Sequence, residues 1–483
     1  MSHPKQTKIV CTIGPASANE DMLRQMMKAG MNVARLNFSH GTHEYHQSNI
    51  DLIRRIAEEE GISIAILQDL QGPKIRVGVL PAEGVLLETG DEVTFICEGE
   101  TDVSKKRLIV TYPNLHGDVK SGERILLDDG LLSAEVLRVE GPEVVCRVID
   151  GGILTSNKGV NFPDSNLTIS SLSDKDRRDV TFGVKNGVDL IALSFVRTAK
   201  EVYDLRYLIK EEEAKLGQVL DREHDIKIIV KVEKAEAVEN IEEILEASDG
   251  VMVARGDLGV EMPAEQVPLI QKQLIDKCLR VAKPVIVATQ MLDSMIRNPR
   301  PTRAEVSDIA NAVIDHTDAV MLSGETASGK FPLQSLETMA TVVRHTEASH
   351  YDFLPIKREL TGSMTDEAVS EVANILARQI KARGILVASI SGRTARLVSR
   401  YRTELPIFAV TNDDRVKRQL ALTWGVTPFV VPTCSTVEEL VERSIAELKA
   451  HHLIKEGQKL IVVAGEPVGT SGGVNMVEIR EIK

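Results

Sequence analysis

The sequence lacks paired cysteines, long apolar runs and an excess of basic residues, and each absence excludes a class of protein. Its five cysteines are scattered, odd in number and never arranged as CxxC, which indicates reduced thiols on small buried side chains rather than a disulfide framework. No apolar run reaches the roughly 18 residues of a transmembrane helix, and the opening MSHPKQTK lacks the apolar segment of a secretory signal. We therefore expect a cytoplasmic protein with no membrane partner.

The charge pattern argues against a polyanionic partner. The formal net charge is −13, and the basic residues are interspersed rather than clustered. This disfavours nucleic acid as a partner, so individual Lys and Arg side chains would have to hold an anionic substrate. The 483 residues, 43% of them hydrophobic, suffice for about three domains.

Short β-rich runs alternate with helical patterns from Thr7 to Leu70 and again from Ser173 onward, and together they give eight strand-helix pairs. Eight pairs predict an α/β fold of the (β/α)8 TIM-barrel type, formed by residues 1–72 and 168–346, with functional side chains at the carboxyl ends of the strands. One helix is predicted over 237–247, and another opens with the capping box Thr302/Glu305. An open doubly wound sheet is the alternative, and it would also place its site at the strand ends.

Two further domains follow from changes in the pattern. Residues 73–167 consist of short alternating strands and Gly-rich turns with no convincing helix, which predicts an inserted all-β domain. We call this insertion the lid, because an insertion at that end of a barrel can close over the active site and expel water; a passive decoration is the alternative. Residues 347–483 alternate again and predict a separate α/β domain, one of whose helices opens at Ser435 and Glu438.

The stretch from Ile228 to Glu261 carries the strongest chemical signal. Lys231 and Glu233 share one face of a predicted strand, and Asp257 ends the next strand 24 residues after Glu233, about one βα unit. Parallel strands bring both carboxylates to one edge of the sheet, beside a lysine. Two carboxylates plus substrate oxygens are typical ligands of Mg2+. The alternative is a pair of solvated charges at helix starts.

Other polar residues follow the same rule of position. Arg35 to His40 end the second barrel strand, Asp69 the third, Thr289 and Gln290 the seventh, and Ser323 to Glu325 the eighth. In the C-terminal domain, residues 389–394 (SISGRT) lie between a strand and a helix, where hydroxyls, backbone N–H groups and a guanidinium favour a phosphate. A plain turn with Ser/Thr caps is the alternative.

Six motifs in order, NVARLNFSHG, IIVKVEKAEAV, MVARGDLGVE, ATQMLDSM, NPRPTRAE and MLSGETASGK, resemble those of the pyruvate kinase family, and the likeness spans essentially the whole chain. The resemblance implies transfer of the phosphoryl group of phosphoenolpyruvate to ADP, giving pyruvate and ATP. Other magnesium-dependent enolate-stabilising barrel enzymes, of the aldolase or phosphoenolpyruvate mutase type, remain as an alternative. A second alternative is a catalytically silent binding protein on this fold.

The resemblance also implies a role for each site residue. Lys231 would neutralise the phosphoryl group in flight and the enolate, Arg35 would grip the phosphate, and Thr289 would relay a proton through water. The substrate carboxylate would lie on the amides of Gly256 and Asp257, and Glu233 and Asp257 would hold Mg2+, or Mn2+ as a substitute. The residues implied for ADP are Asn37, Phe38, Ser39, His40, Arg76 and Lys158.

Three regulatory features are implied as well. A phosphorylated allosteric effector would bind Ser389, Ser391, Gly392, Arg393 and Thr394, with the C-terminal GTSGGVN as the opposite wall, and the assembly would be a homotetramer. Family members often hold K+ at positions corresponding to Asn37, Ser39, Asp69 and Leu70. Here Lys74 replaces the glutamate near that pocket, so its ammonium would substitute for K+, unless Lys74 simply points into solvent.

Overall fold

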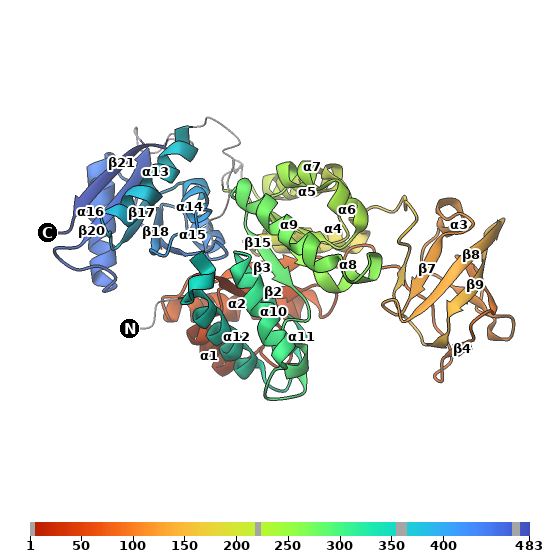
Figure 1. The fold of residues 1–483 in the computed structure, drawn as a ribbon. Coiled ribbons are helices and arrows are strands. Elements are labelled where there is room, and N and C mark those ends of the chain that lie inside the picture. Colours follow the sequence, from red (N-terminus) through yellow and green to blue (C-terminus); the bar gives the residue numbers. More distant parts are fainter. Residues whose placement is uncertain (1–4, 218–223, 354–364, 466–473) are drawn as a thin grey trace.

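The computed structural model describes residues 5–217, 224–353, 365–465 and 474–483, arranged as three bodies in a row (Figure 1). An α/β barrel lies in the middle, the lid projects from one end of it, and the C-terminal domain lies at the other end (Figure 1). Within these residues no helix is long and apolar enough to cross a membrane.

Eight parallel strands close the barrel, in the order β1-β16-β15-β14-β13-β12-β3-β2. This closure confirms the predicted (β/α)8 barrel and excludes the open sheet. The strands are almost completely buried, as expected where helices cover one face and packed side chains fill the other. They are β1 (Lys8–Ile13), β2 (Val33–Asn37), β3 (Ala65–Asp69), β12 (Leu190–Leu193), β13 (Lys227–Val232), β14 (Gly250–Ala254), β15 (Val285–Ala288) and β16 (Ala319–Leu322).

The barrel helices begin at clear capping signals. Thr302 and Glu305 form the predicted capping box, and Ser173 with Asp176 forms another. The helices are α1 (Glu20–Ala29), α2 (His43–Glu59), α4 (Asp174–Lys185), α5 (Ala199–Lys215), α6 (Ala235–Glu239), α7 (Ile241–Ala247), α8 (Arg255–Glu261), α9 (Val267–Arg280), α10 (Arg303–Ile314), α11 (Gly324–Ala327) and α12 (Pro332–Glu347), with 3-10 turns η2 (Asp293–Ile296) and η3 (His350–Phe353).

One helix differs from its prediction. The helix expected over 237–247 is split into α6 and α7 at Asn240, which lies between them with a φ of −92° and a ψ of 16°. The Asn240 side chain donates instead to the carbonyl of Arg197, 3.0 Å away. This bond fixes the Asn240 side chain at the point where the helix breaks.

The lid is a six-stranded sheet, β11-β7-β8-β9-β5-β6, with a two-stranded sheet, β10-β4, beside it. Its one four-residue helix, α3, corrects the expectation of an insertion without helix. The elements are β4 (Val85–Leu87), β5 (Glu92–Ile96), η1 (Val103–Lys105), β6 (Arg107–Ile109), α3 (Leu115–Asp118), β7 (Arg124–Leu127), β8 (Leu132–Glu140), β9 (Glu143–Asp150), β10 (Gly152–Leu154) and β11 (Val160–Asn161). The lid has its own core, which includes Phe95, Leu115 and Phe162.

The C-terminal domain is a five-stranded sheet, β19-β18-β17-β20-β21, parallel except for β21. Its helix α16 is capped by Thr436, whose hydroxyl accepts from the Glu439 amide, so the start predicted at Ser435 is one residue early. The elements are α13 (Thr365–Gln379), β17 (Gly384–Ala388), α14 (Arg393–Ser399), β18 (Ile407–Thr411), α15 (Asp414–Leu420), β19 (Val426–Val430), α16 (Val437–Ala450), β20 (Lys459–Gly465) and β21 (Val474–Glu481).

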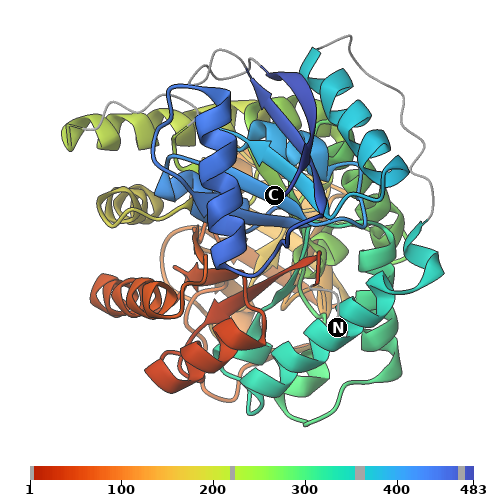
Figure 2. The same ribbon diagram turned by 90° about the vertical axis from the view of Figure 1, so that its left-hand side faces the viewer.

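The C-terminal domain covers the end of the barrel at which the strands begin. Its Ala421 and Leu422 pack with Val10, Met252 and Ile286 in the cluster that fills the barrel interior. Seen from that side, the C-terminal domain lies in front of the barrel (Figure 2). The opposite end, where the strands terminate, faces the lid. All five cysteines are free, and all but Cys97 are buried.

Candidate active site

Lys231 lies at the centre of a buried charge cluster at the carboxyl end of β13. Its Nζ is 2.8 Å from Glu233 Oε1 and 3.5 Å from Asp69 Oδ1, and it donates to Ser194 Oγ at 2.9 Å. These partners come from the ends of β3, β12 and β13, which adjoin in the barrel. The structure therefore brings together Lys231, Glu233 and Asp69, as their strand-end positions predicted.

Burial and charge set the protonation of this cluster. Burial alone would lower the pKa of Lys231, but the carboxylates of Asp69, Glu233 and Asp257 outweigh it and raise that pKa above its ordinary value. Burial, assisted by Asp257, raises the pKa of Glu233 to about 7, although Lys231 opposes the shift. The lysine is thus a permanent cation. The charge of Glu233 is not fully compensated by its neighbours, so an additional positive charge beside it would be favourable.

Arg35 provides the second buried cation. Its Nε donates to Asp69 Oδ2 at 2.6 Å, and its Nη1 donates to Thr12 Oγ1 at 2.8 Å. Asp69 is 1% exposed, and within the described residues its Oδ1 has no hydrogen-bond partner beyond the 3.5 Å approach of Lys231. The two cations share this carboxylate. Among the described residues no hydrogen bond of Arg35 Nη2 is found, which leaves that donor for an anionic ligand.

The short helix α8 places its first turn beside Thr289. The Gly256 amide donates to Thr289 Oγ1 at 2.8 Å, and that hydroxyl donates in turn to the Ala288 carbonyl at 2.6 Å. Thr289 has a φ of 70°, a strained value for a β-branched residue. Arg255 donates to the Thr289 carbonyl at 2.8 Å and is paired with Asp308.

Glu233 and Asp257 fit a magnesium ion. Glu233 is 1% exposed, so it is not a solvated helix-start charge. Within the described residues there is no group of three or more acidic, histidine or cysteine side chains suited to a metal. Two carboxylates that repel one another, as the raised pKa of Glu233 indicates, match an ion that takes its other ligands from water and substrate.

The segment after β2 is ordered by local contacts. Asn37 Oδ1 accepts from the Ser39 amide at 3.1 Å, and His40 is exposed. Phe38 is 2% exposed, and its ring stacks on His46 at 4.0 Å between centroids, so only its backbone could reach a ligand. The Phe38 carbonyl accepts from Lys175 Nζ at 2.6 Å.

Three residues expected near the nucleotide or cation lie in or beside the lid. Lys158 Nζ pairs with Asp128 within the lid at 2.7 Å, and Arg76 donates to the Asn157 carbonyl at 3.0 Å. Lys74 is exposed and lines the cavity between lid and barrel, and among the described residues no side-chain hydrogen bond or ion pair of its ammonium is found. It does not lie among the oxygens of Asp69 and Asn37 in this arrangement.

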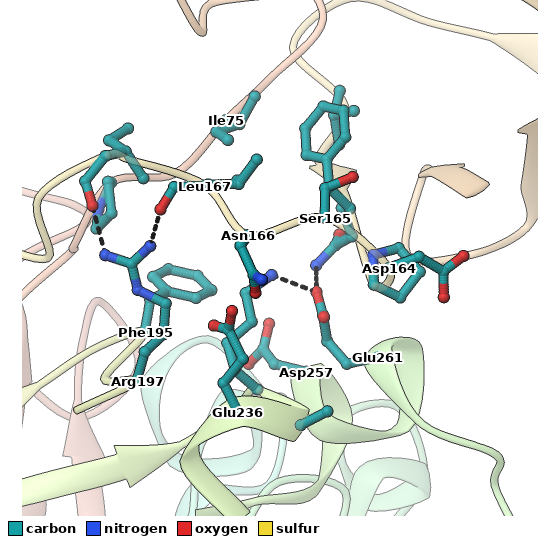
Figure 3. A pocket seen from close by; sticks show the side chains of 18 of the residues that line it. Ile75, Asp164, Ser165, Asn166, Leu167, Phe195, Arg197, Glu236, Asp257 and Glu261 are labelled. Atoms are coloured by element: carbon teal, nitrogen blue, oxygen red, sulfur yellow. Dashed lines mark hydrogen bonds and ion pairs between the residues drawn. The ribbon is translucent and has the colours of Figure 1, made fainter. Parts of the chain in front are cut away.

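The cavity opens between α6 and α8 of the barrel and the chain that returns from the lid, residues 159–169 (Figure 3). Asp257 and Glu261 extend into it from α8 (Figure 3). Glu261 Oε1 accepts from Lys234 Nζ at 2.5 Å and from Asn161 Nδ2 of the lid at 2.9 Å. The short helix α8 therefore carries both a candidate metal ligand, Asp257, and the residue that contacts the lid, Glu261.

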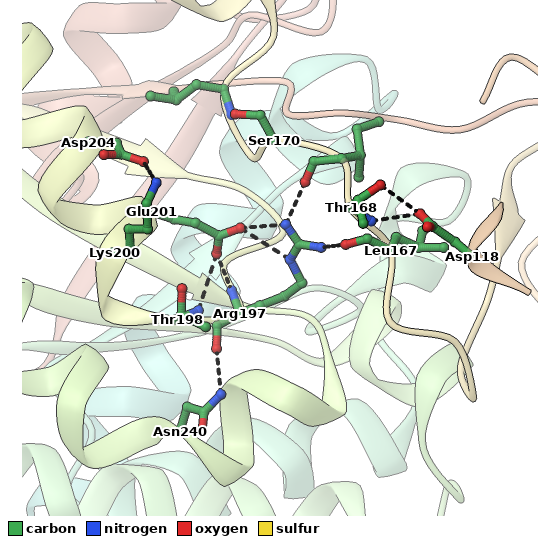
Figure 4. A network of polar contacts seen from close by, with 12 residues as sticks. Asp118, Leu167, Thr168, Ser170, Arg197, Thr198, Lys200, Glu201, Asp204 and Asn240 are labelled. Atoms are coloured by element: carbon green, nitrogen blue, oxygen red, sulfur yellow. Dashed lines mark hydrogen bonds and ion pairs between the residues drawn. The ribbon is translucent and has the colours of Figure 1, made fainter. Parts of the chain in front are cut away.

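Arg197 fixes the returning chain to the barrel (Figure 4). It donates to the carbonyls of Leu167 and Ile169, and Glu201 orients it from 2.6 Å. The intervening Thr168 amide donates to Asp118 of the lid at 2.7 Å. Arg197 and Ser194 are absent from the sequence-based site, although both follow the strand LIAL, where the rule of polar strand ends would have found them.

The predicted effector segment is a tight turn before α14. Ser389 and Thr394 are buried, whereas Arg393 is exposed and its guanidinium lies 3.0 Å from Asp366. Gly392 has a φ of 74°, which favours glycine there. Most of the GTSGGVN segment lies outside the described residues.

Comparisons with known proteins agree with this geometry. The pyruvate kinase barrel-domain model matches residues 4–336, and the pyruvate kinase alpha/beta-domain model matches residues 367–480. The chain belongs to the pyruvate kinase family. It is therefore a phosphotransferase, and family membership favours this chemistry over the aldolase and phosphoenolpyruvate mutase alternatives.

Relatives match over nearly the whole chain. A pyruvate kinase of Geobacillus stearothermophilus is 45% identical over 99% of this chain and 80% of its own length. One from Clostridium perfringens is 42% identical over 99% of this chain and all of its own length. A crystal structure of a pyruvate kinase from Cryptosporidium parvum superposes with a TM-score of 0.92 at 36% identity, covering 99% of this chain and 96% of that one.

Proposed function

We propose that the protein transfers the phosphoryl group of phosphoenolpyruvate to ADP, giving pyruvate and ATP, with residues 1–72 and 168–346 as catalytic barrel, 73–167 as lid and 347–483 as regulatory domain. The observation that carries the proposal is the largely enclosed Lys231, 2.8 Å from Glu233 at the strand ends of a pyruvate kinase barrel. Phosphoryl transfer needs positioning and charge neutralisation, which a fixed buried cation supplies.

Each candidate residue has a task in this reaction. Arg35 binds the phosphate, and Lys231 stabilises the charge that develops on the transferring group and on the enolate. The amides of Gly256 and Asp257 at the start of α8 receive the substrate carboxylate. To do so, the Gly256 amide exchanges Thr289 Oγ1 for the substrate, which frees a lone pair of that oxygen to accept from water. The Thr289 hydroxyl then relays a proton when it turns its own proton from the Ala288 carbonyl toward the enolate.

Glu233 and Asp257 hold Mg2+, with Mn2+ as a substitute. When bound, the ion acts as a Lewis acid and as a template for substrate oxygens. Its positive charge also compensates Glu233, whose pKa is raised to about 7 by burial and by Asp257.

ADP lies on the other side of the phosphoryl group, between the segment after β2 and the lid. Asn37, Ser39, His40 and the Phe38 backbone contribute from the barrel, and Arg76 and Lys158 come from the lid. Lys158 would exchange Asp128 for the nucleotide phosphates.

The deciding experiment is a coupled assay of pyruvate formation from phosphoenolpyruvate and ADP, with and without Mg2+. Activity that needs both substrates and the metal supports the proposal. A folded protein without such activity would instead be a binding protein on this fold.

We also propose that the reaction needs no K+. The acidic oxygens of Asp69 already face Arg35 and Lys231, and the Leu70 carbonyl accepts from Ser194 Oγ at 2.7 Å. Lys74, at the mouth of the cavity, adds a third positive charge when substrate is bound. Rates measured with a bulky tetraalkylammonium as the sole monovalent cation should not rise on addition of K+, whereas Lys74→Glu should create a K+ requirement.

Regulation and assembly are proposed on the same family basis. A phosphorylated metabolite binds at Ser389, Ser391, Gly392, Arg393 and Thr394, and Arg393 leaves Asp366 to meet it. Arg393→Ala should abolish activation by sugar phosphates and nucleoside monophosphates at low substrate while saturated activity persists. The protein is cytoplasmic and a homotetramer, and a monomer in light scattering would refute the assembly.

A further inference from the structure

The lid is joined to the barrel by the two chain connections and by one non-covalent contact from its strands. The outgoing chain turns at Gly72, whose amide donates to buried Asp176 at 3.1 Å, and the returning chain is bound by Arg197. Gly72 has a φ of 69°, and a Cβ there would lie 2.8 Å from the Phe195 ring. These chains form fixed pivots.

The contact from the lid strands is the hydrogen bond from Asn161 Nδ2 to Glu261 Oε1 at 2.9 Å. Tyr112, Asn114 and Asp118 of the lid bond to Thr168, which belongs to the returning chain itself. Apart from these, in the parts of the chain that the structure describes, no other side-chain hydrogen bond joins lid residues 77–161 to the barrel. Beside it, Gly130 of the lid approaches Val260, with 3.7 Å between the position of a Cβ and Val260 Cγ1. A single side-chain hydrogen bond from the lid strands makes a reversible attachment.

The barrel side of this contact is part of the candidate active site. Glu261 is 8% exposed, so its charge needs a partner, and Lys234 supplies it at 2.5 Å. Lys234 directly follows Glu233, and Glu261 lies one helical turn after Asp257 on α8. Both elements that carry a candidate metal ligand thus converge on Glu261.

The lid side of the contact carries the candidate nucleotide residues. Asn161 is on β11, three residues after Lys158, and the intervening Gly159 forms a bridge with Arg76. The position of Asn161 therefore sets the positions of Lys158 and Arg76 relative to the barrel.

We propose that Glu261 is a positioning residue, which docks the lid through Asn161 and so places Lys158 and Arg76 over the nucleotide. This rests on the proposed function for the role of the nucleotide, but the docking itself can be measured without it. Lys234 holds the Glu261 carboxylate from the barrel side, and breaking the Asn161 bond leaves that ion pair intact.

The test compares two substitutions at Asn161 with a matched control. Asn161→Ala removes the bond, and Asn161→Asp is isosteric but sets a carboxylate against Glu261. Asn166→Ala is the control, because Asn166 lines the same cavity and no hydrogen bond of its side chain is found among the described residues.

We expect the KM for ADP to rise about tenfold in Asn161→Ala and further in Asn161→Asp. The KM for phosphoenolpyruvate and the saturated kcat should stay within about threefold, since the barrel cluster is intact. Asn166→Ala should match the unmodified protein. High salt should weaken the effect of Asn161→Asp, because screening reduces like-charge repulsion.

Hydrogen exchange gives the readout that does not depend on activity. Amides of 159–162 and 258–262 should exchange faster in Asn161→Ala than in Asn166→Ala, at equal melting temperature. Equal exchange in these two variants, or equal KM values for ADP, would overturn the role of Glu261. Absence of pyruvate formation by the unmodified protein would refute the proposed function instead, and the exchange experiment would still decide whether Asn161 docks the lid.

Discussion

The two ends of the barrel hold buried charges in different states. At the end where strands begin, Asp189 accepts from Arg418 at 2.7 Å, from Arg54 at 2.7 Å and from the Ile66 amide at 2.8 Å. Asp318 is likewise bound on both oxygens, by Arg402 at 2.9 Å and by the Trp424 amide at 3.1 Å. These carboxylates are saturated by groups of the chain itself, many of them from the C-terminal domain.

At the end where strands terminate, the same kinds of groups are left incompletely matched. Asp69 has one oxygen without a hydrogen bond, and the pKa of Glu233 is raised to about 7 because burial and Asp257 outweigh Lys231. Carboxylates whose oxygens are both hydrogen-bonded within the chain join the C-terminal domain to the barrel. A carboxylate with an unpartnered oxygen, held rigidly, can bind a ligand or a metal. Asp189 and Asp318 therefore differ from Asp69 and Glu233 in their hydrogen bonds and not in their composition. Asp225, just before β13, is an exception, because its Oδ2 also has no hydrogen-bond partner among the described residues.

The sharpest test of this comparison uses two lysines of one strand. Lys231→Met at the end of β13 should lower kcat about 10³-fold, about 4 kcal/mol, with little loss of substrate binding, because its charge acts mainly in the transition state. Lys227→Met, at the start of the same strand, is the control and should change kcat less than about threefold. Steady-state kinetics of both variants decide it, and equal losses would erase the distinction between the two ends.

Breaking a saturated pair should cost stability rather than rate. Arg402→Met leaves Asp318 buried without its guanidinium and should destabilise by about 3 kcal/mol, visible as a lower thermal midpoint. Arg402→Met combined with Asp318→Leu should recover part of the loss, because the uncompensated charge is gone. A midpoint that does not move would mean that this pair contributes nothing to the attachment of the C-terminal domain.

The sequence was sufficient for the barrel and for the strand-end chemistry, because both follow from periodicity and position. Lys231, Glu233 and Asp69 meet as expected since parallel strands must end at one edge. The split of α6 from α7 was missed. The bond made at this break, from Asn240 to the carbonyl of Arg197, joins residues 43 apart in the chain. A hydrogen bond between residues so far apart in the chain leaves no pattern in the sequence around either residue.

The sequence also did not show which of the predicted site side chains are buried. Phe38 belongs to a motif expected to contact nucleotide, yet its ring packs on His46, and only the folded arrangement distinguishes its side chain from its backbone. Lys74 was expected among the oxygens of Asp69 and Asn37, but it is exposed at the cavity. Its proposed role therefore depends on a rearrangement when substrate binds, which the K+ experiment tests.

A smaller effect is expected for one candidate metal ligand. Asp257→Ala should weaken Mg2+ binding about 30-fold, about 2 kcal/mol, and lower turnover at subsaturating metal, because one carboxylate is lost from a hard-cation site. Glu239→Ala, which removes an exposed carboxylate of the same cavity, should leave the metal titration unchanged. If both variants titrate like the unmodified protein, the metal binds elsewhere.

The smallest effect concerns an exception at the saturated end, Asp352. Burial, and next the charge of Glu347, raise its pKa to about 7. Glu404 adds to the rise and Arg402 opposes it, while His316 lies 3.6 Å away.

A carboxyl whose pKa is raised on folding stabilises the protein fully below the unfolded pKa, near 4, and that contribution is lost as pH rises through about 7. The unmodified protein should therefore lose stability between about pH 4 and pH 7 relative to Asp352→Asn, which cannot ionise. Because the carboxyl is partly exposed, solvent screening limits the difference to about 1 kcal/mol. Thermal midpoints of both proteins across this range measure it: the two should agree near pH 4, and the variant should be the more stable at pH 8. Parallel pH profiles would show that Asp352 is matched as fully as Asp189 and Asp318, and would remove the exception.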